Sequence, residues 1–122
     1  MARPVLSESH IHPTIQSKVQ SWHADIIQEV QAAVAGNPVV VVGMSMNPMP
    51  KRARKALDAA AVPYAYLEYG SYFNTWRRRN ALKMWTGWPT FPMVFVKGTL
   101  VGGAVDLEAL IASGELKRML GS

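Results

Sequence analysis

The residues best suited to bind a ligand are basic and aromatic side chains in the middle of the chain. Residues 68–79 end on three consecutive arginines and include four aromatic residues, Tyr69, Tyr72, Phe73 and Trp76. Residues 51–83 hold eight basic and two acidic residues, so the net charge of +5 is concentrated there. Arginine pairs with oxyanions and aromatic rings stack on nucleic-acid bases. This composition therefore suits carboxylates, phosphates or single-stranded nucleic acid.

A structural explanation for residues 69–79 competes with binding. Three adjacent residues of a helix cannot share one face, so the three arginines point in different directions. Tyr72, Phe73 and Trp76 would then close the core while the arginines face solvent. We favour this structural explanation over binding of a small anionic ligand or an acidic protein partner, and we place nucleic-acid binding last.

No complete catalytic set is evident in the sequence. None of the 122 residues is cysteine, which excludes disulfides, thiolate ligands for a metal or an iron–sulfur cluster, and a cysteine nucleophile. His10, His12 and His23 lack carboxylates at ligand spacing, so we expect no metal. There is also no Gly-rich phosphate loop and no Ser/His/Asp set.

The elements that would position these residues follow from the apolar pattern. Apolar residues at spacings of three and four from Ile15 to Val34 predict one amphipathic helix of about 20 residues that begins at Pro13. Residues 36–38, Gly-Asn-Pro, end it. Four consecutive valines at 39–42 predict a strand that is buried on both faces. We expect residues 1–12 to be a flexible, polar lead-in.

The remaining pattern completes one α/β domain over residues 13–122. It predicts helices at 51–61 and 74–86, a strand at 64–67, a hairpin at 92–102 and two short C-terminal helices split by Gly114. The two strands joined through a helix should be parallel, and the hairpin should add antiparallel strands. Without an apolar run of about 20 residues or a signal peptide, we expect no membrane contact and a cytoplasmic location.

Four motifs in the C-terminal half resemble monothiol glutaredoxins. These are Trp88-Pro89-Thr90-Phe91-Pro92, Val94-Phe95-Val96-Lys97-Gly98, Leu100-Val101-Gly102-Gly103 and Ser113-Gly114-Glu115-Leu116. The resemblance covers about residues 15–120 when the element order is included. It implies a thioredoxin-like fold, with a four-stranded mixed sheet flanked by helices, and a cis peptide bond before Pro92.

The chain departs from that family at the redox motif. Asn47-Pro48-Met49-Pro50 stands where the family has Cys-Pro-Tyr-Cys or Cys-Gly-Phe-Ser. Asn47 occupies the nucleophile position and Pro50 the second Cys/Ser position. Asparagine has no thiolate, so we expect neither thiol–disulfide exchange nor cluster ligation by this chain. Asn47 is either a purely structural helix cap, or a cap whose helix N-terminus still receives an anionic or thiol-bearing ligand.

The resemblance also implies a partly kept glutathione site. The positions that match the family's ligand-binding residues are Arg79, Lys83, Thr90, Phe91, Pro92, Gly103 and Ala104. Met44 replaces the family's lysine before the redox motif. Val105 occupies the position of the family's acidic residue, and Asp106 follows one position too late to replace it.

Three functional hypotheses follow. The first is a degenerate module that binds glutathione or another small anion without redox chemistry of its own. The second is an interaction module in which residues 69–79 bind an acidic protein or nucleic acid. The third is an enzyme that keeps glutathione and uses its thiol as the nucleophile.

Overall fold

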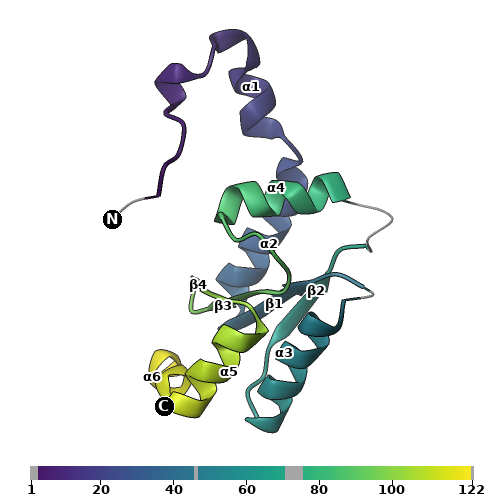
Figure 1. The fold of residues 1–122 in the computed structure, drawn as a ribbon, viewed down its shortest axis with the longest axis vertical. Coiled ribbons are helices and arrows are strands. Elements are labelled where there is room, and N and C mark those ends of the chain that lie inside the picture. Colours follow the sequence, from purple (N-terminus) through teal and green to yellow (C-terminus); the bar gives the residue numbers. More distant parts are fainter. Residues whose placement is uncertain (1–2, 46, 71–75, 122) are drawn as a thin grey trace.

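The computed structural model describes residues 3–45, 47–70 and 76–121. Its helices are η1 (Glu8–His10), α1 (Pro13–Ser21), α2 (Ala24–Gly36), α3 (Pro48–Ala59), α4 (Trp76–Thr86), α5 (Ala104–Ser113) and α6 (Glu115–Leu120). Its strands are β1 (Val39–Gly43), β2 (Ala65–Glu68), β3 (Met93–Val96) and β4 (Thr99–Gly102). They form one sheet in the order β2-β1-β3-β4 (Figure 1).

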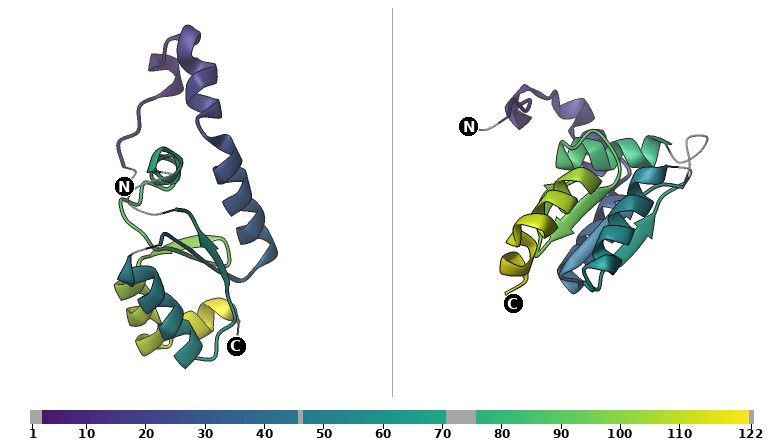
Figure 2. Two further views of the ribbon diagram at one scale, coloured as in Figure 1. Left: turned by 90° about the vertical axis from the view of Figure 1, so that its right-hand side faces the viewer. Right: turned by 60° about the horizontal axis from the view of Figure 1, so that its bottom comes forward.

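The sheet is mixed, as the sequence predicts. β1 is parallel to β2 and antiparallel to β3, and β4 is antiparallel to β3. All five residues of β1 are buried because helices cover both faces of the sheet (Figure 2). Val40 and Val42 pack with residues of α2 and α4, whereas Val39 and Val41 pack with residues of α3 and α5. The thioredoxin-like fold is thereby confirmed.

The prediction of one continuous helix after Pro13 is wrong at two residues, Trp22 and His23, which lie between two helices. His23 adopts the left-handed conformation (φ 46°, ψ 42°) and separates α1 from α2. Histidine is among the residues enriched in that region, and no apolar periodicity marks such a change. α2 carries the core residues Ile26 and Val30, whereas α1 has no buried residue and extends beyond the sheet (Figures 1 and 2).

The N-terminal lead-in returns towards the body of the protein at one contact. The Arg3 guanidinium donates from Nη1 to the carbonyl oxygen of Thr86, at 2.8 Å, at the end of α4. Residues 3–10 are exposed, and the flexibility expected for residues 1–12 stays a prediction. Within the described residues, no helix combines the length and the apolar character that crossing a membrane requires.

Candidate functional site

Asn47 connects the start of α3 to the segment before β3. Its Oδ1 accepts a hydrogen bond from the backbone N–H of Met49 at 2.9 Å, which makes it the N-cap of α3. Its Nδ2 donates to the carbonyl oxygen of Phe91 at 3.4 Å. The carboxamide therefore satisfies one free N–H of the helix end and contacts the neighbouring loop with its other end.

Proline residues shape both sides of this contact. The Phe91–Pro92 peptide bond is cis, and both residues are buried, while Thr90 is exposed. Pro50 is buried in α3 behind Gly43, where an added Cβ would come within 2.7 Å of the Pro50 Cβ. Pro50 thus acts as a packing residue at the position where the family has its second Cys or Ser.

The start of α5 forms the next side of the site. A Cβ on Gly103 would lie 3.7 Å from the carbonyl oxygen of Pro92, so this turn is next to the cis bond. The Gly103 N–H donates to Oδ2 of Asp106 at 3.0 Å. Asp106 is therefore engaged in capping its own helix. Ala104, the first residue of α5, is buried beside the same turn.

The two cations expected at the site lie in different environments. The Lys83 Nζ is 5.8 Å from the centre of the Phe91 ring, within cation–π range, so Lys83 lies next to the site. Arg79 is only 5% exposed, and its Nη1 donates to the carbonyl oxygen of Tyr69 at 3.2 Å. The structure therefore places Lys83 beside the Phe91 ring, but gives Arg79 a buried structural contact.

A cavity of about 400 Å³ lies on the other side of Asn47, towards β2. It is lined by Met44, Ser45, Asn47, Pro48, Pro50, Lys51, Arg54, Tyr66 and Glu68. The Arg54 guanidinium lies 4.0 Å from the centre of the Tyr66 ring, and the Tyr66 hydroxyl donates to Glu68 Oε1 at 3.0 Å. Burial, followed by the Glu68 hydrogen bond, raises the pKa of Tyr66 to about 12. Sequence reasoning missed Arg54 and Tyr66, because the pairing of β2 with β1 is what places Tyr66 against Arg54 of α3 in the cavity that Asn47 also lines.

The basic and aromatic segment 69–79 is described only at its ends. Tyr69 is buried and its hydroxyl donates to Glu29 Oε1 at 2.7 Å; burial and this hydrogen bond raise its pKa. Arg78 pairs with Asp25 at 2.8 Å. Tyr72 and Phe73 lie outside the described residues, and so does the side chain of Trp76, so their predicted core role is not tested. Where residues are described, no group of three or more His, Asp or Glu side chains could hold a metal.

Comparisons with known proteins identify the family of the chain. The glutaredoxin family model matches residues 39–101. A glutaredoxin-like protein of Dictyostelium discoideum is 45% identical over 102 residues, covering 84% of this chain and 83% of the relative. Chloroplastic glutaredoxin-C4 of Oryza sativa is 30% identical over 120 residues, covering 98% of this chain and 90% of its own.

Solved structures give the same result. Oxidized glutaredoxin 2 from Chlamydomonas reinhardtii superposes with a TM-score of 0.69 at 32% identity, covering 80% of this chain and 92% of the other. A buckwheat glutaredoxin–glutathione complex also has a TM-score of 0.69, at 26% identity, covering 83% and 92%. The family match spans more than half of the chain, and the resemblance seen in its motifs is confirmed. This cysteine-free chain belongs to the glutaredoxin family.

Proposed function

We propose that this protein is a glutathione-binding or small-anion-binding module without thiol–disulfide oxidoreductase activity or cluster ligation of its own. The observation that carries the proposal is the pair of hydrogen bonds made by Asn47. Its carboxamide joins the α3 N-terminus to the Phe91 carbonyl. We call the place where Asn47, the α3 N-terminus and the Phe91–Pro92 segment meet the corner, and these hydrogen bonds hold it together without sulfur. The chain has no cysteine to form a mixed disulfide or to ligate a cluster.

The groups around this corner match a small acidic peptide. Lys83 supplies a cation beside Phe91. The first N–H groups of α5, from Ala104 onwards, are suited to a carboxylate, because the positive end of a helix dipole favours anions. Phe91 and the cis Pro92 offer backbone groups beside Thr90. Glutathione has two carboxylates and two peptide bonds, and the buckwheat relative forms a complex with it.

We expect binding to be weak. Arg79 makes an internal contact with Tyr69, Met44 stands where the family has a lysine, and Val105 stands where it has an acidic residue, so three charge-assisted contacts are missing. Each such hydrogen bond contributes about 1.5–3 kcal/mol. Losing two of them already weakens binding by about two to four orders of magnitude relative to a site that keeps them.

A titration with glutathione, followed by ¹⁵N chemical shifts, tests the binding. We expect saturable shifts at Phe91 and Ala104. Lys83→Gln should weaken them, while Lys97→Gln, which removes an exposed lysine in the β3–β4 turn, should not. No shift at these residues up to about 10 mM ligand would contradict glutathione binding. The same titration with succinate and with phosphate distinguishes a general anion site from a peptide site.

A cysteine variant tests the chemistry. The unmodified protein should not reduce a glutathione mixed disulfide above background, whereas Asn47→Cys should gain this activity. The helix N-terminus would lower the pKa of the new thiol and favour the thiolate. Asn47→Ser is the matched control, since it introduces a hydroxyl of similar size. Glutathione-dependent turnover by the unmodified protein would instead indicate an enzyme that uses the thiol of bound glutathione.

A further inference from the structure

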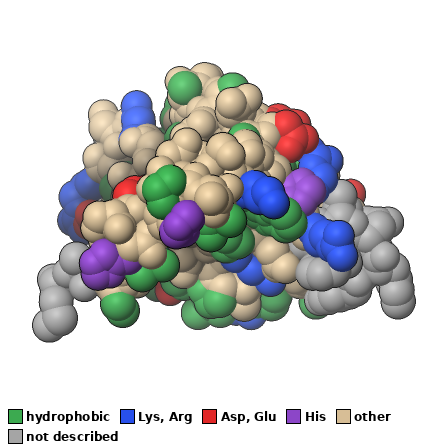
Figure 3. All heavy atoms as spheres, turned by 90° about the horizontal axis from the view of Figure 1, so that it is seen from above, with side chains coloured by type: hydrophobic (Ala, Val, Ile, Leu, Met, Phe, Trp, Pro, Cys, Tyr) green, Lys and Arg blue, Asp and Glu red, His purple; other side chains and the backbone are tan. Residues whose placement is uncertain are grey.

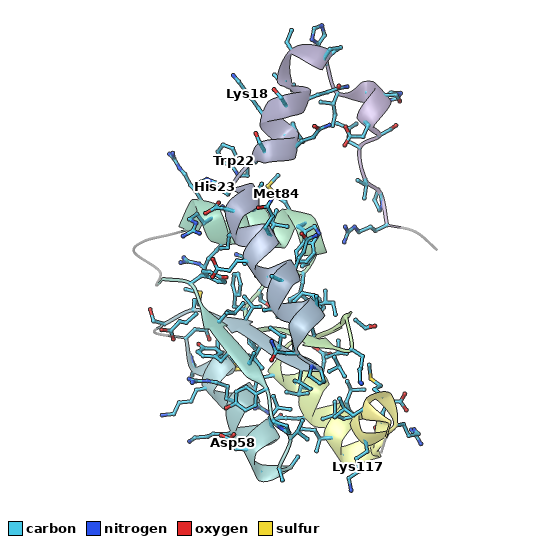
Figure 4. The ribbon with its side chains drawn as sticks, turned by 180° about the vertical axis from the view of Figure 1, so that it is seen from behind. Lys18, Trp22, His23, Asp58, Met84 and Lys117 are labelled. Atoms are coloured by element: carbon cyan, nitrogen blue, oxygen red, sulfur yellow. The ribbon has the colours of Figure 1, made fainter. Side chains whose placement is uncertain are left out.

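The α1–α4 end of the molecule exposes apolar side chains that the proposed glutathione site does not use. Ile15, Val19 and Trp22 of the α1 segment are 44%, 43% and 44% exposed, and Met84 of α4 is 65% exposed. Figure 4 shows Trp22 and Met84 where the α1–α2 junction passes α4, with Lys18 one turn further along α1. Clustered apolar surface of this kind is typical of an interaction site.

These side chains line a groove rather than a flat surface. The groove has a volume of about 550 Å³ and is lined by Ile15, Lys18, Val19, Trp22, Arg77, Asn80 and Met84. Ile15, Val19 and Trp22 have the spacing i, i+4, i+7 and form a stripe about 10 Å long. A partner helix with apolar residues at the same spacing would match this stripe, as in helix-in-groove recognition. A flat membrane surface fits a concave groove less well.

The charge of the groove restricts its partner further. Lys18 and Arg77 belong to its lining, and none of the described lining residues is acidic. Hydrophobic and basic side chains lie next to each other when the molecule is viewed from the α1 end (Figure 3). A second copy in a two-fold pairing would place one basic lining against another, and the chain already carries a net charge of +5. Carboxylates beside the partner's apolar face would complement Lys18.

We propose that the α1–α4 groove docks an acidic amphipathic helix of another protein. Trp22 is the central anchor of this interface, because buried tryptophan contributes strongly to protein contacts. Its ring already lies edge-on against His23, with the ring centres 4.7 Å apart. The groove is formed by α1 and α4, on a different part of the molecule from Asn47, so this proposal does not depend on glutathione binding.

A designed peptide tests the proposal with the full-length protein. The probe is a fluorescein-labelled helix of about 16 residues, with leucine at i, i+3, i+4 and i+7 of each repeat and glutamate at most other positions. Fluorescence anisotropy should show saturable binding that weakens as salt is added. A scrambled peptide of the same composition should bind at least about tenfold more weakly, because its leucines no longer share one face.

Matched valine variants locate the binding. Val19→Ser should weaken peptide binding by at least about tenfold. Val105→Ser, at a 57%-exposed valine of α5, should leave binding unchanged. Because α1 has no buried residue, Val19→Ser should retain the fold, and circular dichroism checks this. Lys18→Glu should weaken binding of the acidic peptide and strengthen binding of a version in which lysine replaces the glutamates.

Several results would overturn the proposal. One is equal binding of the ordered and scrambled peptides, and another is no binding of either. A concentration-dependent dimer that Val19→Ser abolishes would assign the groove to a second copy of this chain. Binding to phosphatidylcholine–phosphatidylserine vesicles that Val19→Ser abolishes, without peptide binding, would assign it to a membrane surface. If the protein binds the acidic peptide but does not bind glutathione, the groove proposal stands and only the proposed glutathione site is contradicted.

Discussion

The corner at Asn47 and the α1–α4 groove use their side chains in opposite ways. At the corner, polar groups bond to one another: Asn47 to Met49 and Phe91, and Asp106 to Gly103. In the groove, apolar side chains such as Val19 and Met84 stay in contact with water. The corner is therefore a preformed frame that the protein stabilises by itself. The groove can bury its apolar area only when a partner covers it.

The largest expected effect is on the free energy of unfolding, and it distinguishes a buried isoleucine of α2 from an exposed isoleucine of α1. Ile26 on α2 is fully buried, and Ile15 on α1 is 44% exposed. Ile26→Ala should lower the free energy of unfolding by about 2–5 kcal/mol, because it leaves a cavity in the core. Ile15→Ala should change it by no more than about 0.5 kcal/mol. Urea denaturation of the two variants measures the difference.

A large loss of stability in Ile15→Ala would contradict the comparison. It would mean that α1 packs on the body of the protein in solution and that its apolar stripe is covered. Ile15→Ala should also weaken binding of the acidic peptide. Weaker binding together with an unchanged unfolding curve would show that Ile15 contacts the peptide and does not act through the stability of the fold.

The second effect concerns the cap at the corner. Asn47→Ala removes the acceptor for the Met49 N–H and should lower the free energy of unfolding by about 1 kcal/mol. Asn47→Asp keeps a good cap but lacks the donor to the Phe91 carbonyl. Asn47→Asp should retain most of the stability while changing the NMR chemical shifts of Phe91 and Pro92. Equal stability of Asn47→Ala and the unmodified protein would show that the cap is unimportant.

A smaller effect is expected at the start of α5. Asp106→Ala removes the acceptor for the Gly103 N–H and should cost about 0.5–1 kcal/mol. Asp106→Asn keeps an oxygen acceptor and should cost less. Thermal unfolding measures both. If neither variant changes stability, the cap contributes little and Asp106 is available for a ligand.

The smallest expected effect belongs to Tyr66, and its contribution to stability is lost at high pH. The pKa of Tyr66 is raised to about 12, whereas an unfolded tyrosine titrates near 10. The folded state thus holds the proton more tightly, so its stabilisation is complete below about pH 10 and is lost as pH rises towards 12. Absorbance at the phenolate band should show late-titrating tyrosines, and Tyr66→Phe should remove one of them while Tyr69 still titrates late. A normal titration of every tyrosine would contradict this environment.

Much of the fold could be predicted because the decisive signals are local. The valine run, the hairpin motifs and the Asn47-Pro48 helix start each depend on neighbouring residues, and the structure has these elements at those places. The break at Trp22 and His23 could not be predicted, because a change of backbone conformation at these two residues leaves the apolar spacing unchanged. The environment of Arg79 was also beyond sequence reasoning, since it depends on a carbonyl ten residues away that only the packing of α4 brings close.

The sequence by itself determined the family, the mixed sheet and the absence of a cysteine thiol, since these depend on residue types and their order. Only the tertiary structure decided which groups meet. It placed the Asn47 carboxamide against Phe91, Lys83 beside the same ring, and Arg79 inside the protein. It also left the first part of the regular apolar pattern, from Ile15 to Trp22, exposed to solvent, while Ile26 and Val30 of the same pattern are buried. Hydrogen bonds and burial are set by distances between segments remote in the chain, and residue spacing carries no record of those distances.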